Sequence, residues 1–452
     1  MNESNPNQAA LRIIPREAHC ISRKQISSGA LRVLYRLNEA GYAAYLVGGA
    51  VRDLLIGGQP KDFDVATDAT PEDVRRLFRN CRLIGRRFRL AHVVFGPEIV
   101  EVATFRGNGG DDIDTDGDRQ VVDGRIVRDN VWGTLEEDAL RRDFTVNALY
   151  YDIADFSVRD YVGGYDDVQR RVLRLIGDPL QRYREDPVRM LRAVRLSAKL
   201  GFSISPEARA PFTDLGVLLT QAPPARLFDE SLKMFLAGNG LKSFRALEQF
   251  GLLGAVFPLT ARALAFRGGE TFRAVVEAGL AGTDARVSED KSVTPAFLFA
   301  VLLWGAVRAQ AEREIARGVE SNVAWQRVSH QVIAEQAKHV AIPRRFGQVM
   351  QEIWTLQPRF ADRQKKKVFR LLAHPRFRGA YDFLLLRAAE GDDIAELGRW
   401  WTRAQSTPHE TLAEELSTAP SSALAPAGDA PKKRRRRRRR PSAQASAATD
   451  SQ

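Results

Sequence analysis

Two patterns of hydrophobic and polar residues divide this chain near residue 175. Before that point, short apolar runs alternate with glycine-containing turns, as in a mixed sheet with a few helices. After it, apolar residues recur at helical spacing to about residue 404. We therefore expect an α+β fold, a small mixed-sheet head domain followed by all-helical domains. The expected units are a mobile N-terminal segment, the head, a helical neck, a helical body and a disordered basic tail: 1–22, 23–175, 176–265, 266–404 and 405–452.

Several local signals predict individual elements of the head. A helix at about 28–40 has Ser27 or Ser28 as its N-cap and Gly41 after its end. Thr70, followed by proline and acidic residues, opens another helix. The strands expected are a buried one at 43–47, one that carries Asp62 and Asp64, and a hairpin formed by 92–95 and 98–105.

The second half of the chain predicts helices with short connections. They are expected at 184–200, 206–220, 225–237 and 241–251, with more to about residue 404. Its longest apolar run, from Pro295 to Val307, is too short to span a bilayer and reads as a buried helix.

Charge is concentrated at one end of the 452-residue chain. Lys432 to Arg440 are nine consecutive cations, so most of the net charge of +12 lies in this run. The two cysteines, Cys20 and Cys81, lack metal-ligand spacing and do not suggest disulfides, which fits a reducing cytoplasm. The polar start, Met1 to Ala10, lacks the apolar segment of a signal peptide.

Asp62 and Asp64 are the strongest chemical signal in the sequence. In a strand they lie on one face, and Gly48-Gly49 just upstream lets backbone amides approach a phosphate group. Two carboxylates on one face are what two-metal phosphoryl transfer requires. The alternative is an ordinary surface Asp-x-Asp in a loop.

Two further acidic features are more ambiguous. Glu101 falls in a row with Ile99, Ala103 and Phe105, either as a third metal-side carboxylate or as an edge-strand charge. Residues 107–133 predict a long loop, in which Asp112 to Gly117 match the start of an EF-hand loop. Position 12 of that match is Asp123 instead of Glu, so a mobile lid is favoured over a calcium site.

Five ordered motifs resemble the class II template-independent nucleotidyltransferases, which comprise CCA-adding tRNA enzymes and bacterial poly(A) polymerases. The resemblance is dense over about 19–260. The motifs are Leu46-Val47-Gly48-Gly49-Ala50-Val51-Arg52-Asp53, Asp62-Phe63-Asp64, Arg141-Arg142-Asp143-Phe144-Thr145-Val146-Asn147-Ala148-Leu149, Asp160-Tyr161-Val162-Gly163-Gly164 and Glu185-Asp186-Pro187-Val188-Arg189.

Within that superfamily, the segment from Leu83 to Val93 is similar to one that marks the poly(A) polymerase branch. The block from Tyr183 to Arg195 and the basic tail also fit that branch. No His-Asp dipeptide occurs, so the metal phosphohydrolase domain of many CCA-adding enzymes has no candidate here.

The resemblance implies a catalytic centre with two Mg²⁺ ions, Mn²⁺ remaining an option. Asp62 and Asp64 would hold the metal, and Asp143 would be a further catalytic carboxylate. The strand argument nominates Glu101 for the same task, and the sequence alone does not rank the two.

The resemblance also implies a set of nucleotide-binding residues. They are Gly48, Gly49, Arg52, Asp53, Arg142, Asn147, Asp186, Arg189, Arg192 and Arg195. Asp186 and Arg189, at i and i+3, would read the incoming base. The alternatives are an exposed helix salt bridge for this pair, and a structural ion pair of Arg142 with Asp143 or Glu137.

Basic segments beyond the head predict contacts with RNA. Gln364 to Arg378 mixes cations with aromatics, as RNA-binding surfaces and solvated amphipathic helices both do. The tail would bind RNA phosphates without reading sequence, through Lys432, Lys433, Arg434, Arg435 and Arg436. Nuclear localisation and an anionic-membrane anchor are the other interpretations of the tail.

The function favoured by the resemblance is poly(A) synthesis, with AMP transferred from ATP to RNA 3′ ends and pyrophosphate released. The alternatives are a CCA-adding enzyme using CTP and ATP, and a non-catalytic RNA-binding scaffold. We expect a cytoplasmic monomer without a membrane-spanning segment, acting on RNA, with RNA-decay proteins as possible partners.

Overall fold

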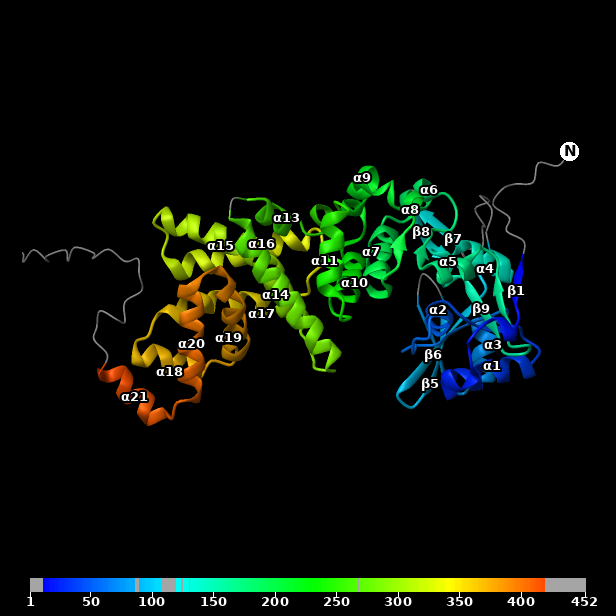
Figure 1. Cartoon of the computed structure of the whole chain (residues 1–452), viewed down its shortest axis with the longest axis horizontal. Helices are drawn as coiled ribbons and strands as arrows, with labels where there is room; N and C mark the ends of the chain where they lie inside the picture. The colour runs from blue at the N-terminus through cyan, green and yellow to red at the C-terminus, as the bar shows by residue number, and fades with distance from the viewer. Residues whose placement is uncertain are drawn as a thin grey trace, which may run out of the picture.

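A computed structural model describes residues 11–85, 89–107, 119–122, 125–129, 131–266 and 268–418 (Figure 1). Within these ranges the first part of the chain carries a mixed sheet, and the chain after it is almost entirely helical. The predicted α+β fold is confirmed. No helix among the described residues is both long and apolar enough to cross a membrane.

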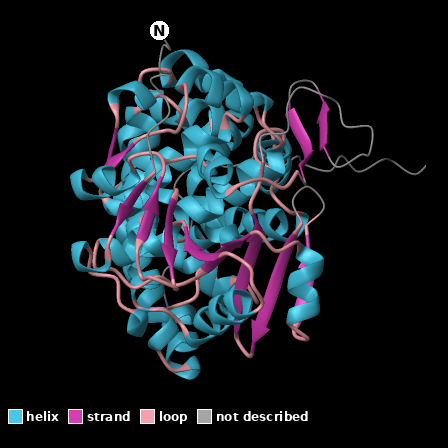
Figure 2. Ribbon diagram, turned by 90° about the vertical axis from the view of Figure 1, so that its right-hand side faces the viewer, coloured by secondary structure: helices cyan, strands magenta, loops and turns pink. Residues whose placement is uncertain are grey.

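One mixed sheet forms the centre of the head (Figure 2). In the described residues it has eight strands in the order β1-β10-β9-β2-β3-β6-β5-β4. Neighbours pair antiparallel except β3 and β6, which are parallel. In that order the strands are Arg12–Ile14, Val158–Asp160, Leu149–Asp152, Ala44–Val47, Asp64–Thr67, Glu98–Thr104, Leu90–Phe95 and Cys81–Ile84.

Helices cover both faces of this sheet. Leu46 and Val65 pack on one face with residues of α1 and α3, whereas Tyr45 and Val47 pack on the other with Ala139 of α4. The head helices are α1 (Ser28–Glu39), α2 (Gly49–Leu55), α3 (Pro71–Leu77), α4 (Leu135–Arg141) and α5 (Gly164–Arg170).

The predicted caps of α1 and α3 are confirmed. Ser27 accepts a hydrogen bond from the backbone N–H of Ala30, and Gly41 after the helix has a φ of 88°. Thr70 and Asp73 form a reciprocal capping box. These local signals fix where both helices begin.

Two expectations about irregular segments are wrong. The mobile N-terminal segment expected over 1–22 contains β1, which pairs with β10 and buries Ile14. The loop expected over 107–133 contains an antiparallel hairpin, β7 (Arg119–Val122) with β8 (Arg125–Asp129). Residues 112–117, the EF-hand-like segment, lie outside the described residues.

The helices of the neck are shorter and more often interrupted than the sequence predicted. The helix expected at 184–200 is interrupted, because Pro187 cannot continue α6 and instead precedes α7. The helix expected at 206–220 is three short pieces. The helices are α6 (Pro179–Glu185), α7 (Val188–Leu200), α8 (Pro206–Arg209), α9 (Phe212–Leu215), α10 (Pro224–Phe235), α11 (Gly240–Gln249), α12 (Leu253–Val256) and α13 (Pro258–Ala265), with a 3-10 turn at Gly216–Gln221 and the short parallel pair β11 (Val172–Leu173) and β12 (Ser203–Ile204).

The rest of the described chain is helical, and Figure 1 shows it at the opposite end of the elongated molecule from the head. The predicted buried helix is α15, which is longer than its apolar run. The helices are α14 (Gly269–Ser288), α15 (Pro295–Ala316), α16 (Ser321–Ala337), α17 (Arg344–Leu356), α18 (Lys365–Leu372), α19 (Phe377–Leu386), α20 (Asp392–Ser406) and α21 (His409–Thr418).

The hydrophobic core does not divide at the expected neck–body boundary. One cluster of buried residues runs from Ile14 in the head to Phe383 in α19. A second cluster, from Leu356 to Leu416, belongs to the last helices and centres on Trp401. Helix α21 therefore contradicts disorder from residue 405, because Leu412 and Leu416 are buried in that cluster.

Candidate active site

The candidate site forms where β2 leads through Gly48-Gly49 into α2. Gly48 has a φ of 75°, a conformation that L side chains rarely adopt, and it caps α2. A Cβ at Gly48 would lie 3.5 Å from an Arg142 guanidinium nitrogen, and one at Gly49 would lie 3.4 Å from an Arg52 nitrogen. Two guanidinium groups thus border the glycine turn.

Asp64 and Glu101 lie side by side on two interior strands of the sheet, at the start of β3. Asp64 is the first residue of β3 and pairs in register with Glu101 of β6 and Val47 of β2. Burial, and next the charge of Glu101, raise the pKa of Asp64 to about 6, although the side chain still contacts solvent. The charged form of the Asp64 carboxylate is therefore disfavoured both by its surroundings and by the neighbouring Glu101.

Asp62 precedes the strand instead of lying within it, which corrects the expectation that one strand carries both aspartates. It is exposed and contributes to the raised pKa of Asp64. The two carboxylates are therefore close enough to repel each other, as the Asp-x-Asp motif requires.

The setting of Glu101 also differs from the sequence argument. The buried face of β6 carries Val100, Val102 and Thr104, whereas Ile99 is exposed and Glu101 is half-buried. Glu101 is thus not a charge within a buried row. It faces the same side of the sheet as Asp64 and accepts a hydrogen bond from His92 Nε2 at 3.4 Å.

Arg142 is held by a buried cluster beside Asp64. Its guanidinium donates to Asp138 at 3.0 Å and to the Tyr150 hydroxyl at 2.9 Å, and Tyr150 in turn donates to Asp138 at 2.7 Å. Burial lowers the pKa of Arg142, but Tyr150 and Asp138 outweigh it, so the pKa is raised. The carboxylate paired with Arg142 is Asp138, whereas the sequence argument had considered Asp143 or Glu137, and Asp143 pairs with Arg192 instead.

Arg52, Asp53 and Asn147 form a second polar cluster. Arg52 is only 3% exposed, and it donates to Asp53 at 2.9 Å and to the side-chain oxygen of Asn147. Lys199 of α7 lies 3.9 Å from Asp53. This cluster fixes the start of α2 against the 3-10 turn Thr145–Asn147.

Asp143 is hydrogen-bonded to the neck. It accepts from Arg192 of α7 at 2.6 and 2.7 Å, and from Asn147 at 3.3 Å. Burial raises the pKa of the Asp143 carboxyl, but Arg192 outweighs it and the pKa is lowered. This ion pair joins the head to the neck, as do hydrogen bonds from Arg182 to the carbonyls of Arg141 and Arg142 at 2.8 and 2.7 Å.

The structure does not pair Asp186 with Arg189. Asp186 is the C-cap residue that follows α6, and it accepts two hydrogen bonds from Arg226 of α10, at 3.0 and 2.8 Å. Arg189, in the first turn of α7, donates to Glu185 at 3.0 Å. The exposed helix salt bridge between Asp186 and Arg189, considered above, is therefore not formed.

The remaining predicted residues fall into three groups. Arg195 pairs with Glu230 of α10. The cations of 364–378 lie mostly on exposed faces of α18 and α19 while Val368 and Leu371 are buried, as in an amphipathic helix. The tail residues Lys432 to Arg436, and Arg86 to Phe88 of the branch-marking segment, lie outside the described residues.

Sequence reasoning missed the partners that hold these residues. They are Asp138, Tyr150, Arg182, Arg226 and Glu230. Asp138 is at i−4 from Arg142, a helical spacing that the sequence displays. Arg226 and Glu230 reach the site only through the packing of α10 on α7, for which the sequence has no signal.

Comparisons with known proteins show the family and the fold of the chain. The chain matches family models described as "Poly A polymerase head domain" over 44–174, "Probable RNA and SrmB- binding site of polymerase A" over 201–264 and "Polymerase A arginine-rich C-terminus" over 317–441. A solved CCA-adding enzyme from Bacillus stearothermophilus in complex with CTP is 26% identical, covers 86% of this chain and 80% of its own, and has a TM-score of 0.53.

The fold and the site thus define a template-independent nucleotidyltransferase. Among curated relatives, poly(A) polymerase I of Salmonella typhi is 50% identical over 93% of this chain and 92% of its own length. That of Haemophilus influenzae is 44% identical over 85% and 86%. A CCA-adding enzyme of Lactobacillus johnsonii is 36% identical over only 50% of this chain.

The chain belongs to the bacterial poly(A) polymerase I family. It is an enzyme that adds AMP from ATP to RNA 3′ ends with release of pyrophosphate, as predicted. CCA-adding enzymes are distant relatives, and the scaffold alternative is set aside. Nucleotidyltransferases of this family use divalent metal ions.

Proposed function

We propose that Asp62, Asp64 and Glu101 form the metal-binding centre of this poly(A) polymerase, with Mg²⁺ as the ion and Mn²⁺ as a substitute. The observation that carries the proposal is the in-register pair of Asp64, at the start of β3, and Glu101, within β6, which keeps two carboxylates on one face of the sheet. Burial, and next the Glu101 carboxylate, raise the pKa of Asp64, and a bound divalent cation would favour the charged carboxylate against both.

The donor set suits a hard cation. Within the described residues no group of three or more His, Cys, Asp and Glu side chains is placed so that it could hold a metal ion, so Asp62, Asp64 and Glu101 are not preassembled as a three-ligand site. Mg²⁺ in phosphoryl-transfer enzymes takes one or two carboxylates and completes its shell with water and substrate phosphates. An incomplete protein shell therefore fits Mg²⁺ bound together with ATP.

When bound, the two ions lower the pKa of the RNA 3′-hydroxyl and neutralise charge on the triphosphate and the leaving pyrophosphate. The chain's own residues position the substrates. Gly48 and Gly49 admit the phosphates close to the backbone, and the guanidinium groups of Arg52 and Arg142 border the same turn. Their positive charge would stabilise a triphosphate held there.

Asp143 has a different role in this proposal. Because its carboxylate accepts from Arg192, it positions that guanidinium and connects the head to the neck. Asp186 and Arg189 would read the adenine base, with Arg226 and Glu185 fixing their orientations. Glu101 is therefore preferred over Asp143 as the third catalytic carboxylate.

Finer expectations about the whole chain stand as proposals beside this one. We infer a cytoplasmic monomer that binds RNA 3′ ends, with the residues from Lys432 to Arg436 as a phosphate-binding tail. The support is the match to family models described as RNA-binding and arginine-rich, and to bacterial relatives. Recruitment of RNA-decay proteins rests on the family resemblance, and the division into head, neck and body at residues 175 and 265 rests on the sequence pattern, although one buried cluster runs across residue 265.

Primer extension tests the metal-site proposal. Asp62→Asn, Asp64→Asn and Glu101→Gln should each reduce AMP transfer to an oligo(A) primer by at least about a hundredfold, because each removes charge from the metal centre. Asp68→Asn is the matched control, because Asp68 is exposed just after the other end of β3. Full activity of Asp64→Asn, or an equal loss in Asp68→Asn, would refute the assignment.

A further inference from the structure

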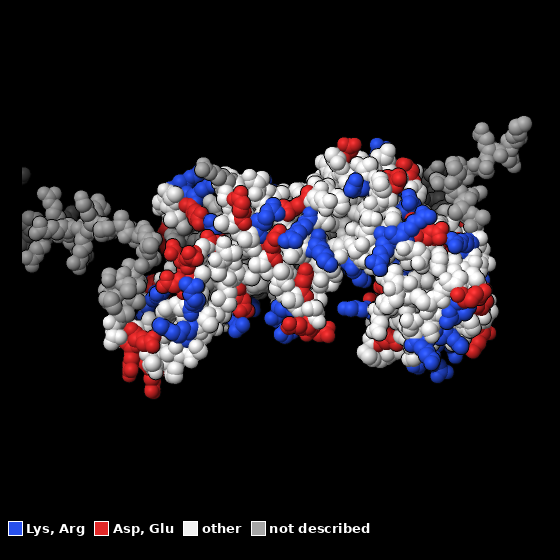
Figure 3. Space-filling view, viewed as in Figure 1, with Lys and Arg blue, Asp and Glu red and all other residues white. Residues whose placement is uncertain are grey.

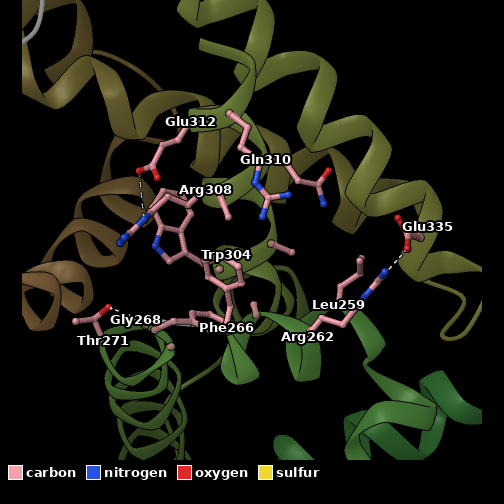
Figure 4. Close-up of a pocket in the computed structure, with 17 residues that line it drawn as sticks. Leu259, Arg262, Phe266, Gly268, Thr271, Trp304, Arg308, Gln310, Glu312 and Glu335 are labelled. Carbon is pink, nitrogen blue, oxygen red and sulfur yellow. Dashed lines mark hydrogen bonds and ion pairs between the residues drawn. The ribbon is translucent and has the colours of Figure 1, made fainter. Parts of the chain in front are cut away.

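A cavity of about 480 Å³ lies where α13 meets α14 and α15, apart from the catalytic residues (Figure 4). Its floor is aromatic. Trp304 is buried, and its indole N–H is already satisfied by Glu390 at 2.6 Å. A Cβ at Gly305 would lie 2.7 Å from the Phe272 ring, so this glycine lets the ring pack directly on α15.

Phe266 borders the cavity with an unusual degree of exposure. It follows α13, and 64% of it is exposed, more than any other large hydrophobic residue in the described ranges. The Arg313 guanidinium lies 5.9 Å from the centre of its ring. An exposed aromatic face beside a cation is the usual arrangement for stacking an unpaired base near its phosphate.

Polar groups of the cavity differ in whether they have partners. Arg262 pairs with Glu335 at 2.6 Å, and Arg308 with Glu390 at 2.8 Å. Over the ranges that the structure describes, however, Arg313 has no carboxylate partner and Gln310 has no hydrogen bond to its side-chain amide. Gln310 is half-buried, so its amide offers a donor and an acceptor to a ligand.

These groups match the chemistry of one base. A glutamine amide forms paired hydrogen bonds with N6 and N7 of adenine, a purine edge that pyrimidines do not have. The cavity is large enough for one nucleotide, and it opens to solvent, so the rest of the strand can lie outside it. Adenosine is also the unit that this enzyme adds to RNA.

We propose that this cavity binds an unpaired adenine nucleotide of the RNA tail already synthesised, upstream of the reacting 3′ end. Phe266 stacks on the base, Gln310 reads its edge, and Arg313 contacts the adjacent phosphate. The enzyme then holds its own product and favours further extension of adenosine-ended RNA. The proposal depends on poly(A) synthesis but not on the metal assignment.

Equilibrium binding to the full chain tests it without catalysis. Fluorescence anisotropy is measured without divalent ions, using labelled oligo(A) and oligo(U) of equal length. Phe266→Ala should weaken oligo(A) binding about tenfold and Gln310→Leu about fivefold, with a smaller effect on oligo(U). Arg313→Ala should weaken both RNAs, because phosphate contacts do not depend on the base.

The chain offers matched controls. Val217 is 62% exposed and does not line the cavity, so Val217→Ala should leave oligo(A) affinity unchanged. Arg317, just beyond α15, is exposed and outside the lining, so Arg317→Ala isolates the general effect of losing one cation. AMP transfer to a primer too short to reach the cavity should be unchanged in Phe266→Ala.

Three results would overturn the proposal. Wild-type affinity in both Phe266→Ala and Gln310→Leu would exclude base binding in the cavity. Equal losses for oligo(A) and oligo(U) in Gln310→Leu would exclude adenine recognition. Equilibrium dialysis that finds AMP bound to the wild type but not to Phe266→Ala, with unchanged oligo(A) affinity, would assign the cavity to a free mononucleotide.

Discussion

The ion pair between Asp143 and Arg192 allows the two candidate third carboxylates to be told apart. Arg192 donates to Asp143 at 2.6 and 2.7 Å, and the Asp143 side chain is 12% exposed. Hydrogen bonds between opposite charges contribute about 1.5–3 kcal/mol each. Because the Arg192 side chain is 34% exposed, solvent weakens the pair, and we expect a coupling of about 2 kcal/mol in total.

A double-mutant cycle measures this coupling during AMP transfer. Asp143→Asn and Arg192→Met each break the same pair, so either should lower kcat/KM for ATP by about 30-fold. The kcat/KM of the double variant should be no lower than that of the less active single variant, because the same interaction is lost only once. Single-nucleotide addition to oligo(A) at varied ATP and Mg²⁺ concentrations provides the rates.

The Mg²⁺ dependence separates a positioning role from a metal-binding role. The Mg²⁺ concentration for half-maximal activity should stay near the wild-type value in Asp143→Asn and rise in Glu101→Gln. Multiplicative losses in the double variant would refute the positioning role of Asp143. So would a raised Mg²⁺ requirement in Asp143→Asn alone.

Three further predictions concern other parts of the molecule. Arg226→Gln should raise KM for ATP by about tenfold and weaken discrimination against CTP, because it removes the guanidinium that holds Asp186. Lys233→Ala on the same helix is the control and should change neither. Unchanged nucleotide selection in Arg226→Gln would contradict the role of Asp186 in reading the base. Truncation after Pro420 should spare AMP transfer to a short primer but weaken binding to long RNA at low salt; unchanged affinity would leave the tail without an RNA role. Burial lowers the pKa of His19 below its ordinary 6.5, so at pH values near and below 6.5 the folded state binds fewer protons than the unfolded state. The stability of the wild type should therefore fall as the pH drops below 6.5. Thermal melts of wild type and His19→Gln should diverge in that range, and parallel curves would disprove the prediction.

Local signals were sufficient where one residue decides a conformation. Gly48, the cap at Thr70 and the hairpin at Gly96-Pro97 follow from the sequence because each depends on neighbours a few residues away. The alternation in β6 was assigned to the wrong face, since Ile99 and Ala103 look apolar but lie on the less buried side. Which face of a strand is covered depends on α1 and α4, not on the strand itself.

The candidate residues were found individually, but their partners were not. The motif containing Asp143 identifies the residue, yet whether it faces the metal centre or Arg192 depends on how α7 packs on the head. The break at Pro187 changes the direction of the chain between Asp186 and Arg189, so helical spacing misjudged that pair. Figure 3 shows Lys and Arg side chains gathered along the surface between head and body, an arrangement that sequence position alone does not predict.

Direct measurement of bound metal is the strongest test of the central claim, that Asp62, Asp64 and Glu101 hold the ions for AMP transfer. Mn²⁺ binding can be followed by electron paramagnetic resonance in the presence of a non-hydrolysable ATP analogue. We predict two ions for the wild type and for Asp143→Asn, and a loss of tight binding in Asp64→Asn and Glu101→Gln. Unchanged Mn²⁺ binding in Asp64→Asn would contradict the account.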